Sequence, residues 1–260
     1  MKTNIIYNHS CENMSEVDNN SIGAVISSPP YYSLKDYCSW KTYDDYLKFL
    51  EIVLSECYRA LRPGGWVCWN IQECIPFPPN ANPGHRRTIE RYCEPLLAQT
   101  ISIMSKVGFL YEKTICWNKN TATQRLFGSM PYPSLILISG ITEYIITMRK
   151  PRGNFKLELS DEIKEKSKLT TEEWKKWAID VWTFAPETHS WHPAPFPYEL
   201  PNRCVKLFSF FDDVILDPFM GSFTTAIAAK NNGRRYIGFE IHQEYIDKGN
   251  LELQANNQLF

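Results

Sequence analysis

The last third of the chain carries the pattern that most restricts its fold: a strand, a tight turn, a helix and a second strand. Residues 214–216 form a short apolar run, and a turn over 217–223 follows it. We expect residues 224–231 to be helical and residues 236–239 to form a second strand, which ends at Glu240. Strands that alternate with helices in this way build doubly wound, mostly parallel α/β sheets.

The first part of the chain shows the same succession. The apolar run 23–27 stops at Pro29-Pro30, which is typical of a buried parallel strand that leads into a loop at its carboxyl end. Apolar residues spaced three and four apart predict a helix over 47–61, with Pro63-Gly64-Gly65 ending it. Residues 66–71 then form the next predicted strand.

The middle of the chain mixes such elements with irregular segments. We expect a helix over 96–107 that ends at Gly108, a good left-handed C-terminal residue, and strands over 111–117 and 143–149. Residues 72–95 and 118–140 have loop composition. Residues 150–180 are charged, with a helix near 171–178, and are interpreted as a solvated surface insertion.

Composition sets broad limits on what the chain does. Its 260 residues suffice for one sizeable core, and 28 Lys and Arg against 29 Asp and Glu exclude a histone-like polycation and a disordered polyelectrolyte. A local basic face that binds DNA stays compatible with this balance. The eight cysteines include no CxxC pair, so we expect small core residues and no metal site. With no signal-like segment or membrane-length apolar run, we expect a cytoplasmic protein.

The turn after residue 216 predicts a nucleotide-binding site. Backbone N–H groups at the start of the following helix approach a ligand there, and an acid at the tip of the next strand, Glu240, accepts hydrogen bonds from ribose hydroxyls. Asp217 at the first strand tip disfavours a dinucleotide and favours a cofactor with a positive group, such as S-adenosylmethionine (AdoMet). The alternative is an ordinary strand–helix–strand unit in which Asp217 caps the helix.

The second motif, Ser28-Pro29-Pro30-Tyr31, suits chemistry on an exocyclic amine. The prolines fix the direction of the Pro29 carbonyl, Ser28 adds a hydroxyl acceptor beside it, and Tyr31 adds a flat stacking face. The lone pair of such an amine is conjugated with the base ring, and two acceptors on its hydrogens favour the pyramidal geometry that frees it to attack a methyl group. Stacking of a flipped base on an aromatic ring contributes about 1–3 kcal/mol.

Together the two motifs resemble those of the DNA amino-methyltransferases, and their order resembles the β group of that family. The resemblance covers most of the chain and implies a Rossmann-like, AdoMet-dependent methyltransferase sheet with an inserted target-recognition region. It divides one compact domain into a catalytic half (1–71), a recognition region interleaved with core elements (72–180) and an AdoMet-binding half (181–260).

The resemblance also implies roles for individual residues. The catalytic residues would be Ser28, Pro29, Pro30 and Tyr31. The cofactor-binding residues would be Ser10, His192, Pro193, Pro195, Asp217, Phe219, Gly221, Thr224, Thr225 and Glu240. Two positions depart from the family: Asn8-His9-Ser10 replaces a frequent Gly-Asp pair, and Phe223 replaces a common second glycine. Phe223 either narrows the pocket or packs on the sheet, and we favour packing.

A serine in the first motif favours cytosine N4 over adenine N6 as the methylated atom. We expect direct in-line transfer to a flipped base, since no Pro-Cys nucleophile is present. The alternatives are adenine N6 methylation, methylation of RNA or of a protein amide, and a DNA-binding module without catalysis. The implied partners are duplex DNA and a cognate restriction endonuclease; the target sequence and the choice between monomer and homodimer stay open.

Basic side chains in the irregular segments are the candidate DNA contacts. The residues selected for this role are Arg86, Arg87, Arg91, Lys119 and Arg125. Lysines and arginines at 149–152 are further candidates, and each group is equally compatible with ordinary solvated charge.

Overall fold

The computed structural model describes residues 1–32, 40–77, 92–120, 140–187, 191–192, 195 and 197–255. Its centre is a mixed eight-stranded sheet. Across the sheet, the strands are β1 (Ile5–Tyr7), β10 (Arg235–Phe239), β9 (Val214–Asp217), β2 (Ile22–Ser27), β3 (Leu61–Ile71), β7 (Thr142–Arg149), β6 (Leu110–Asn118) and β8 (Val181–Thr183). Neighbours from β1 to β3 pair in parallel, while β7 runs antiparallel to both β3 and β6. This confirms the predicted α/β fold with a mostly parallel sheet.

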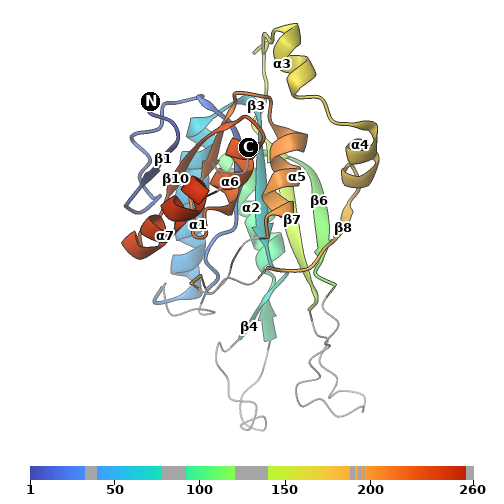
Figure 1. The fold of residues 1–260 in the computed structure, drawn as a ribbon. Helices are drawn as coiled ribbons and strands as arrows, with labels where there is room; N and C mark the ends of the chain where they lie inside the picture. Colours follow the sequence, from blue (N-terminus) through green and yellow to red (C-terminus); the bar gives the residue numbers. More distant parts are fainter. Residues whose placement is uncertain are drawn as a thin grey trace, which may run out of the picture.

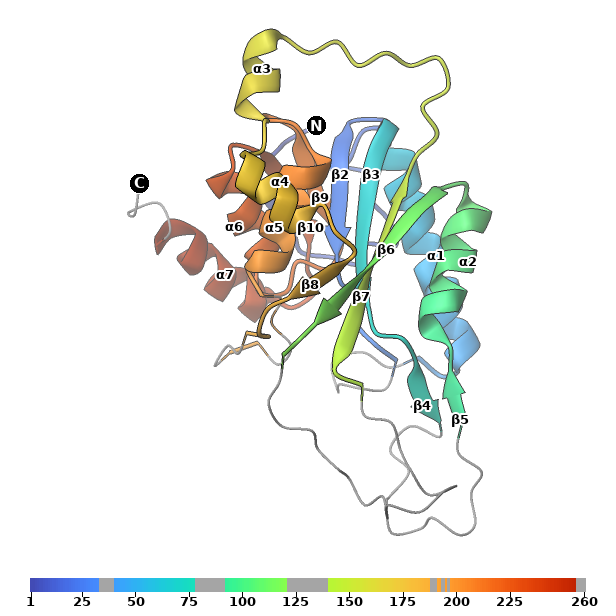
Figure 2. The same cartoon turned by 90° about the vertical axis from the view of Figure 1, so that its right-hand side faces the viewer.

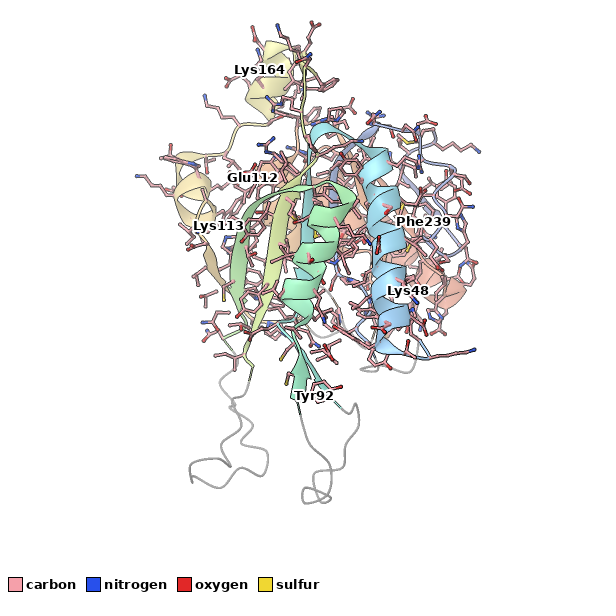
Figure 3. The ribbon with its side chains drawn as sticks, turned by 180° about the vertical axis from the view of Figure 1, so that it is seen from behind. Lys48, Tyr92, Glu112, Lys113, Lys164 and Phe239 are labelled. Carbon is pink, nitrogen blue, oxygen red and sulfur yellow. The ribbon has the colours of Figure 1, made fainter. Side chains whose placement is uncertain are left out.

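Helices cover both faces of this sheet. The helices are α1 (Tyr43–Ala60), α2 (Leu96–Val107), α3 (Asp161–Lys166), α4 (Thr171–Trp177), α5 (Glu199–Phe208), α6 (Thr224–Asn231) and α7 (Gln243–Ala255). Figure 3 shows α1 and α2 side by side over one face, and Figure 2 shows α5 and α6 on the other. The sheet is therefore buried between two helical layers, as apolar strands such as β2 require.

The helix predicted over 47–61 begins and ends earlier than its apolar pattern suggests. Thr42 caps α1, because its side chain accepts from the Asp45 N–H and the Asp45 carboxylate accepts from the Thr42 N–H. Leu61 has the extended angles φ −66° and ψ 133°, and it pairs with Ile22 as the first residue of β3. Gly64, at φ 78°, lies within β3 and does not end the helix.

Two irregular regions contain more regular structure than their composition suggests. The described ends of the 72–95 region form an antiparallel hairpin of β4 (Ile75–Phe77) and β5 (Tyr92–Glu94). Figures 1 and 2 show this hairpin beyond the carboxyl end of β3, whereas α3 lies at the opposite end of the molecule. The α3 part of the charged stretch 150–180 therefore lies far from the carboxyl edge of the sheet, whereas the end of the stretch leads into β8, which pairs with the carboxyl end of β6.

The described cysteines are all free, and four of them, Cys11, Cys57, Cys68 and Cys204, are buried as expected of small core residues. Cys93 is exposed on β5, so that expectation is wrong for this position. None of the described helices is long and apolar enough to cross a membrane. Within the same residues, His, Cys, Asp and Glu side chains form no group of three that could hold a metal.

Candidate active site

A cavity of about 1020 Å³ opens at the carboxyl edge of the parallel strands, where the order of strands reverses between β9 and β2. Both sequence motifs line it, Ser28 to Tyr31 after β2 and Asp217 to Ser222 after β9. The Ser27 hydroxyl donates to Asp217 Oδ1 at 2.5 Å, which joins the two strand ends directly. Two stretches almost two hundred residues apart in the chain thus form one site.

Asp217 is a buried carboxylate held by short contacts. The residue is 3% exposed, and Oδ1 accepts from the Ser27 hydroxyl and from the Phe219 N–H at 3.0 Å. Burial raises the pKa of Asp217 to about 6, although hydrogen bonds from Ser27, Thr225 and the Phe219 N–H oppose the shift. A buried acid beside a cavity, without a basic partner in its described contacts, is suited to a positively charged ligand.

Glu240 is fixed by two backbone donors at the end of β10. Its carboxylate accepts from the Gly221 N–H at 3.0 Å and from the His242 N–H at 2.8 Å. Burial raises the pKa of Glu240 above its ordinary range, and these N–H groups partly offset the shift. Each oxygen keeps capacity for a further donor, as recognition of ribose hydroxyls requires.

Gly221 has a backbone conformation that disfavours any residue with a side chain. Its φ is 47°, in the left-handed region, and a Cβ there would lie 2.9 Å from His192 Nε2. His192 and Pro195 both line the cavity. The glycine thus lets the turn after β9 approach both His192 and the Glu240 carboxylate.

The N-terminal segment reaches the cavity although it lacks the expected Gly-Asp pair. Asn8 donates from its amide to the carbonyls of Glu240 at 3.0 Å and Ile241 at 3.2 Å, which fixes the segment beside β10. Ser10 lines the cavity, and its hydroxyl donates to Glu12 at 2.9 Å. Because β1 pairs with β10, this segment belongs spatially to the cofactor half rather than to the catalytic half.

Of the remaining cofactor candidates, three line the cavity and one lies outside the described residues. Phe219, Thr224 and Thr225 line the cavity, with both threonines at the start of α6. Pro193 lies outside the described residues. The same is true of four DNA candidates, Arg86, Arg87, Arg91 and Arg125.

Phe223 lies in the core and not in the pocket lining. It is fully buried against α6 and α7, and a Cβ at Gly249 would lie only 2.2 Å from its ring. Packing, the interpretation favoured from sequence, agrees with this position, although the ring contacts helices more than the sheet. Phe223 also has a positive φ of 63°, which costs a non-glycine residue about 1–2 kcal/mol.

We therefore expect Phe223→Gly to destabilise the protein by about 2–4 kcal/mol. Loss of a buried phenyl ring costs about 3–5 kcal/mol, and relief of the backbone strain returns only part of it. Urea unfolding measures the change, with Phe223→Leu as a control that keeps the strain and most of the packing. Unchanged stability together with tighter cofactor binding would show instead that the ring narrows the pocket.

Lys119 lies in the cavity wall. Its ammonium pairs with Glu143, and it lies 5.3 Å from the Trp117 ring. The polar cluster, which we define as Tyr31, Asn70, Lys119 and Glu143, continues to Ser28, since the Asn70 amide donates to Ser28 Oγ at 3.4 Å. Of this cluster, sequence reasoning missed Asn70 and Glu143 as site residues. Their only signal was a polar residue at each strand end.

The basic residues at 149–152 do not reach this edge. Arg149 ends β7 at the amino edge of the parallel strands and pairs with Glu112. The Lys150 ammonium donates to the carbonyls of Tyr58 at 2.7 Å and Leu61 at 2.9 Å, so it stabilises the α1–β3 junction. Their position argues against a role in holding DNA at the cavity.

Comparisons with known proteins identify the family of this chain. Residues 22–251 match the family model described as DNA methylase. The chain is 29% identical over 255 residues to the type II β methyltransferase M.BslI of Bacillus sp. strain NEB-606, covering 94% of this chain but about a quarter (26%) of that protein. It is 26% identical to the DNA adenine methyltransferase YhdJ of Escherichia coli, covering 94% of this chain and 80% of YhdJ.

Solved structures share the fold over nearly the whole chain. TTHA0409 of Thermus thermophilus, in complex with S-adenosyl-L-methionine, superimposes with a TM-score of 0.75 at 30% identity, covering 95% of this chain and 92% of that one. The cytosine-N4-specific PvuII DNA methyltransferase superimposes with a TM-score of 0.69 at 17% identity, covering 99% and 91%. With its cavity, its two joined motifs and a family match over most of its length, this chain belongs to the N6/N4 DNA methylase family.

Proposed function

We propose that this protein transfers a methyl group from AdoMet to the exocyclic N4 amine of cytosine in duplex DNA. The observation that carries the proposal is the hydrogen bond between Ser27 and Asp217, because it joins the two motif corners at one cavity. An acceptor base at Ser28 and a cofactor beside Asp217 would then lie within reach of each other, as direct transfer requires.

The residues at the cofactor end fit AdoMet. Asp217 offers a buried carboxylate to a positive group, and Glu240 offers two oxygens already oriented by backbone N–H groups. AdoMet, when bound, supplies a methyl group on a positively charged sulfur. His192 and Pro195 line the same space and would limit the access of water to it.

The residues at the acceptor end fit an amine. Ser28 and the Pro29 carbonyl would accept the two amino hydrogens, and Tyr31 would stack on the flipped base. Burial raises the pKa of the Tyr31 phenol well above its ordinary value, with the nearby Glu143 carboxylate adding to the shift, so this hydroxyl stays a neutral donor. Catalysis would rest on position and on acceptors aimed at the reacting amine.

The choice of N4-cytosine rests on Ser28, and adenine N6 is the second candidate, because the family includes enzymes of both kinds. DNA from a host that expresses the protein, hydrolysed to nucleosides and analysed by mass spectrometry, distinguishes them. We expect N4-methylcytosine, whereas N6-methyladenine alone would reverse the choice of base. Labelling of RNA or protein without DNA would contradict the proposal, as would DNA binding without AdoMet binding.

AdoMet affinity should fall as pH decreases through about 6. The pKa of Asp217 is raised to about 6, so lower pH protonates it and removes its attraction for a positive ligand, by up to about tenfold per pH unit. Glu240, whose pKa is also raised, acts in the same direction. Calorimetry between pH 5 and 8 measures the effect, with Asp217→Asn as a control whose affinity should vary less with pH.

Further parts of the proposal follow from the family resemblance. Duplex DNA would be held partly by the arginines at 86, 87, 91 and 125, and a restriction endonuclease of the same specificity would act beside the enzyme. Methylation-aware sequencing of the host DNA reports the target sequence that the enzyme and the endonuclease would share.

A further inference from the structure

Polar residues line the carboxyl edge of the sheet in the order of its strands. Glu240 follows β10, Asp217 ends β9, and Ser28 follows β2. The polar cluster continues the series, with Asn70 in β3, Glu143 in β7 and Lys119 directly after β6. The register confirms this continuity, since Trp117 on β6 pairs with Glu143 on β7. The polar cluster thus lies on the side of Ser28 away from Asp217, where the body of an acceptor base would lie.

Three donors hold the carboxylate at the centre of the polar cluster. Glu143 accepts from Asn70 Nδ2 at 2.6 Å and from the Tyr31 hydroxyl at 3.3 Å, and it pairs with Lys119. The side-chain oxygen of Asn70, Oδ1, is buried and has no partner among the described residues. The contacts of Nδ2 with Glu143 and Ser28 therefore orient the side-chain amide. Glu143 therefore has one fixed position relative to the first motif.

Lys119 is placed differently from an ordinary surface lysine. Its side chain is 27% exposed and that of Glu143 is 14% exposed, and both line the cavity. By contrast, Lys113, which lies on β6 and does not line the cavity, pairs with Asp180, and their side chains are 62% and 56% exposed. The lining contains just two lysines within the described part of the chain, and the other one, Lys48, lies on α1.

We propose that Lys119 contacts the flipped base and favours cytosine, with Glu143 as the residue that positions it; this rests on the proposed function. When the exocyclic amine sits at Ser28, the ring atom two positions away carries the O2 oxygen in cytosine and a hydrogen in adenine. An ammonium directed at that atom finds the O2 acceptor in cytosine, whereas adenine presents a C–H group at the same position. A site built to hydrogen-bond one group rejects an analogue that lacks it.

Lys119→Met tests this contact, because methionine keeps most of the length of the side chain without its charge. The substrate is plasmid DNA from a host without DNA modification, and the readout is kcat/KM for N4-methylcytosine formation, measured by nucleoside mass spectrometry. We expect a loss of at least tenfold, with AdoMet affinity by calorimetry unchanged within about twofold. Any adenine methylation should rise relative to cytosine methylation. Lys113→Met is the matched control and should leave both values unchanged.

Glu143→Gln separates contact from positioning. Glutamine can still accept from Asn70 and Tyr31 but no longer pairs with a charged lysine, so we expect a lower kcat/KM with AdoMet affinity retained. Full cytosine methylation by folded Lys119→Met protein would overturn the role of Lys119 and leave the proposed function intact. Formation of N6-methyladenine alone by the unmodified protein would overturn the proposed function itself.

Discussion

Asp217→Asn should make the ligand-free protein more stable at pH 8, by up to about 3 kcal/mol. The pKa of this carboxyl is raised from 3.8 to about 6 by burial, and each pKa unit corresponds to about 1.36 kcal/mol. Because the folded state favours the protonated acid, burying the Asp217 charge lowers the stability of the unmodified protein. This loss of stability is absent below pH 3.8 and grows until pH exceeds about 6. Asparagine keeps an oxygen for the Ser27 hydroxyl and the Phe219 N–H but has no charge to bury.

The same substitution should weaken AdoMet binding about 10–150-fold, since a hydrogen bond to a charged group contributes about 1.5–3 kcal/mol. Urea unfolding at pH 4 and pH 8 and calorimetry at pH 8 test both effects. The measurement at pH 4 is the control, because the difference in stability between the variant and the unmodified protein should vanish there. If Asp217→Asn were as stable as the unmodified protein at both pH values and bound AdoMet with full affinity, the role given to Asp217 would be contradicted.

Ser28→Ala should lower kcat about 100-fold while leaving AdoMet affinity nearly unchanged. The hydroxyl would act chiefly as the amine reacts, and loss of one oriented hydrogen-bonding group from such a site costs about 10²–10³-fold in rate. Single-turnover methylation of DNA at saturating AdoMet measures this rate.

Ser27→Ala is the matched control, because the two adjacent serines face different parts of the site. Ser27 donates to Asp217, and its loss raises the pKa of that carboxyl further. We expect weaker AdoMet binding and a nearly normal rate at saturation. An unchanged methylation rate in Ser28→Ala would contradict the acceptor role of Ser28. A slow methylation rate at saturating AdoMet in Ser27→Ala alone would do the same.

The sequence predicts the centre of the fold because its strands are apolar runs with clear ends. Residues 23–27 and 214–216 both lead into motifs at their carboxyl ends, and parallel pairing brings those ends together. Short or polar elements escape such reasoning. β1 and β8 have three residues each, and α5 contains Pro201 near its start, where a helix tolerates proline although the residue does not look helical in sequence.

Part of the site is equally beyond sequence reasoning. Asn70 and Glu143 are polar residues near the ends of mostly apolar strands, and their proximity depends on the antiparallel register of β3 and β7, with Asn70 opposite Ile145. The charge of Lys119 predicts a DNA contact but not its place. The structure places it in the cavity wall, paired with Glu143.

A crystal structure of the protein with AdoMet most directly tests the joining of cofactor and acceptor sites in one cavity. We expect the positive end of the ligand beside Asp217, its ribose at Glu240, and its methyl carbon directed toward the space beside Ser28. A ligand bound elsewhere, or one whose methyl group faces away from the first motif with protein between them, would contradict this account of the enzyme.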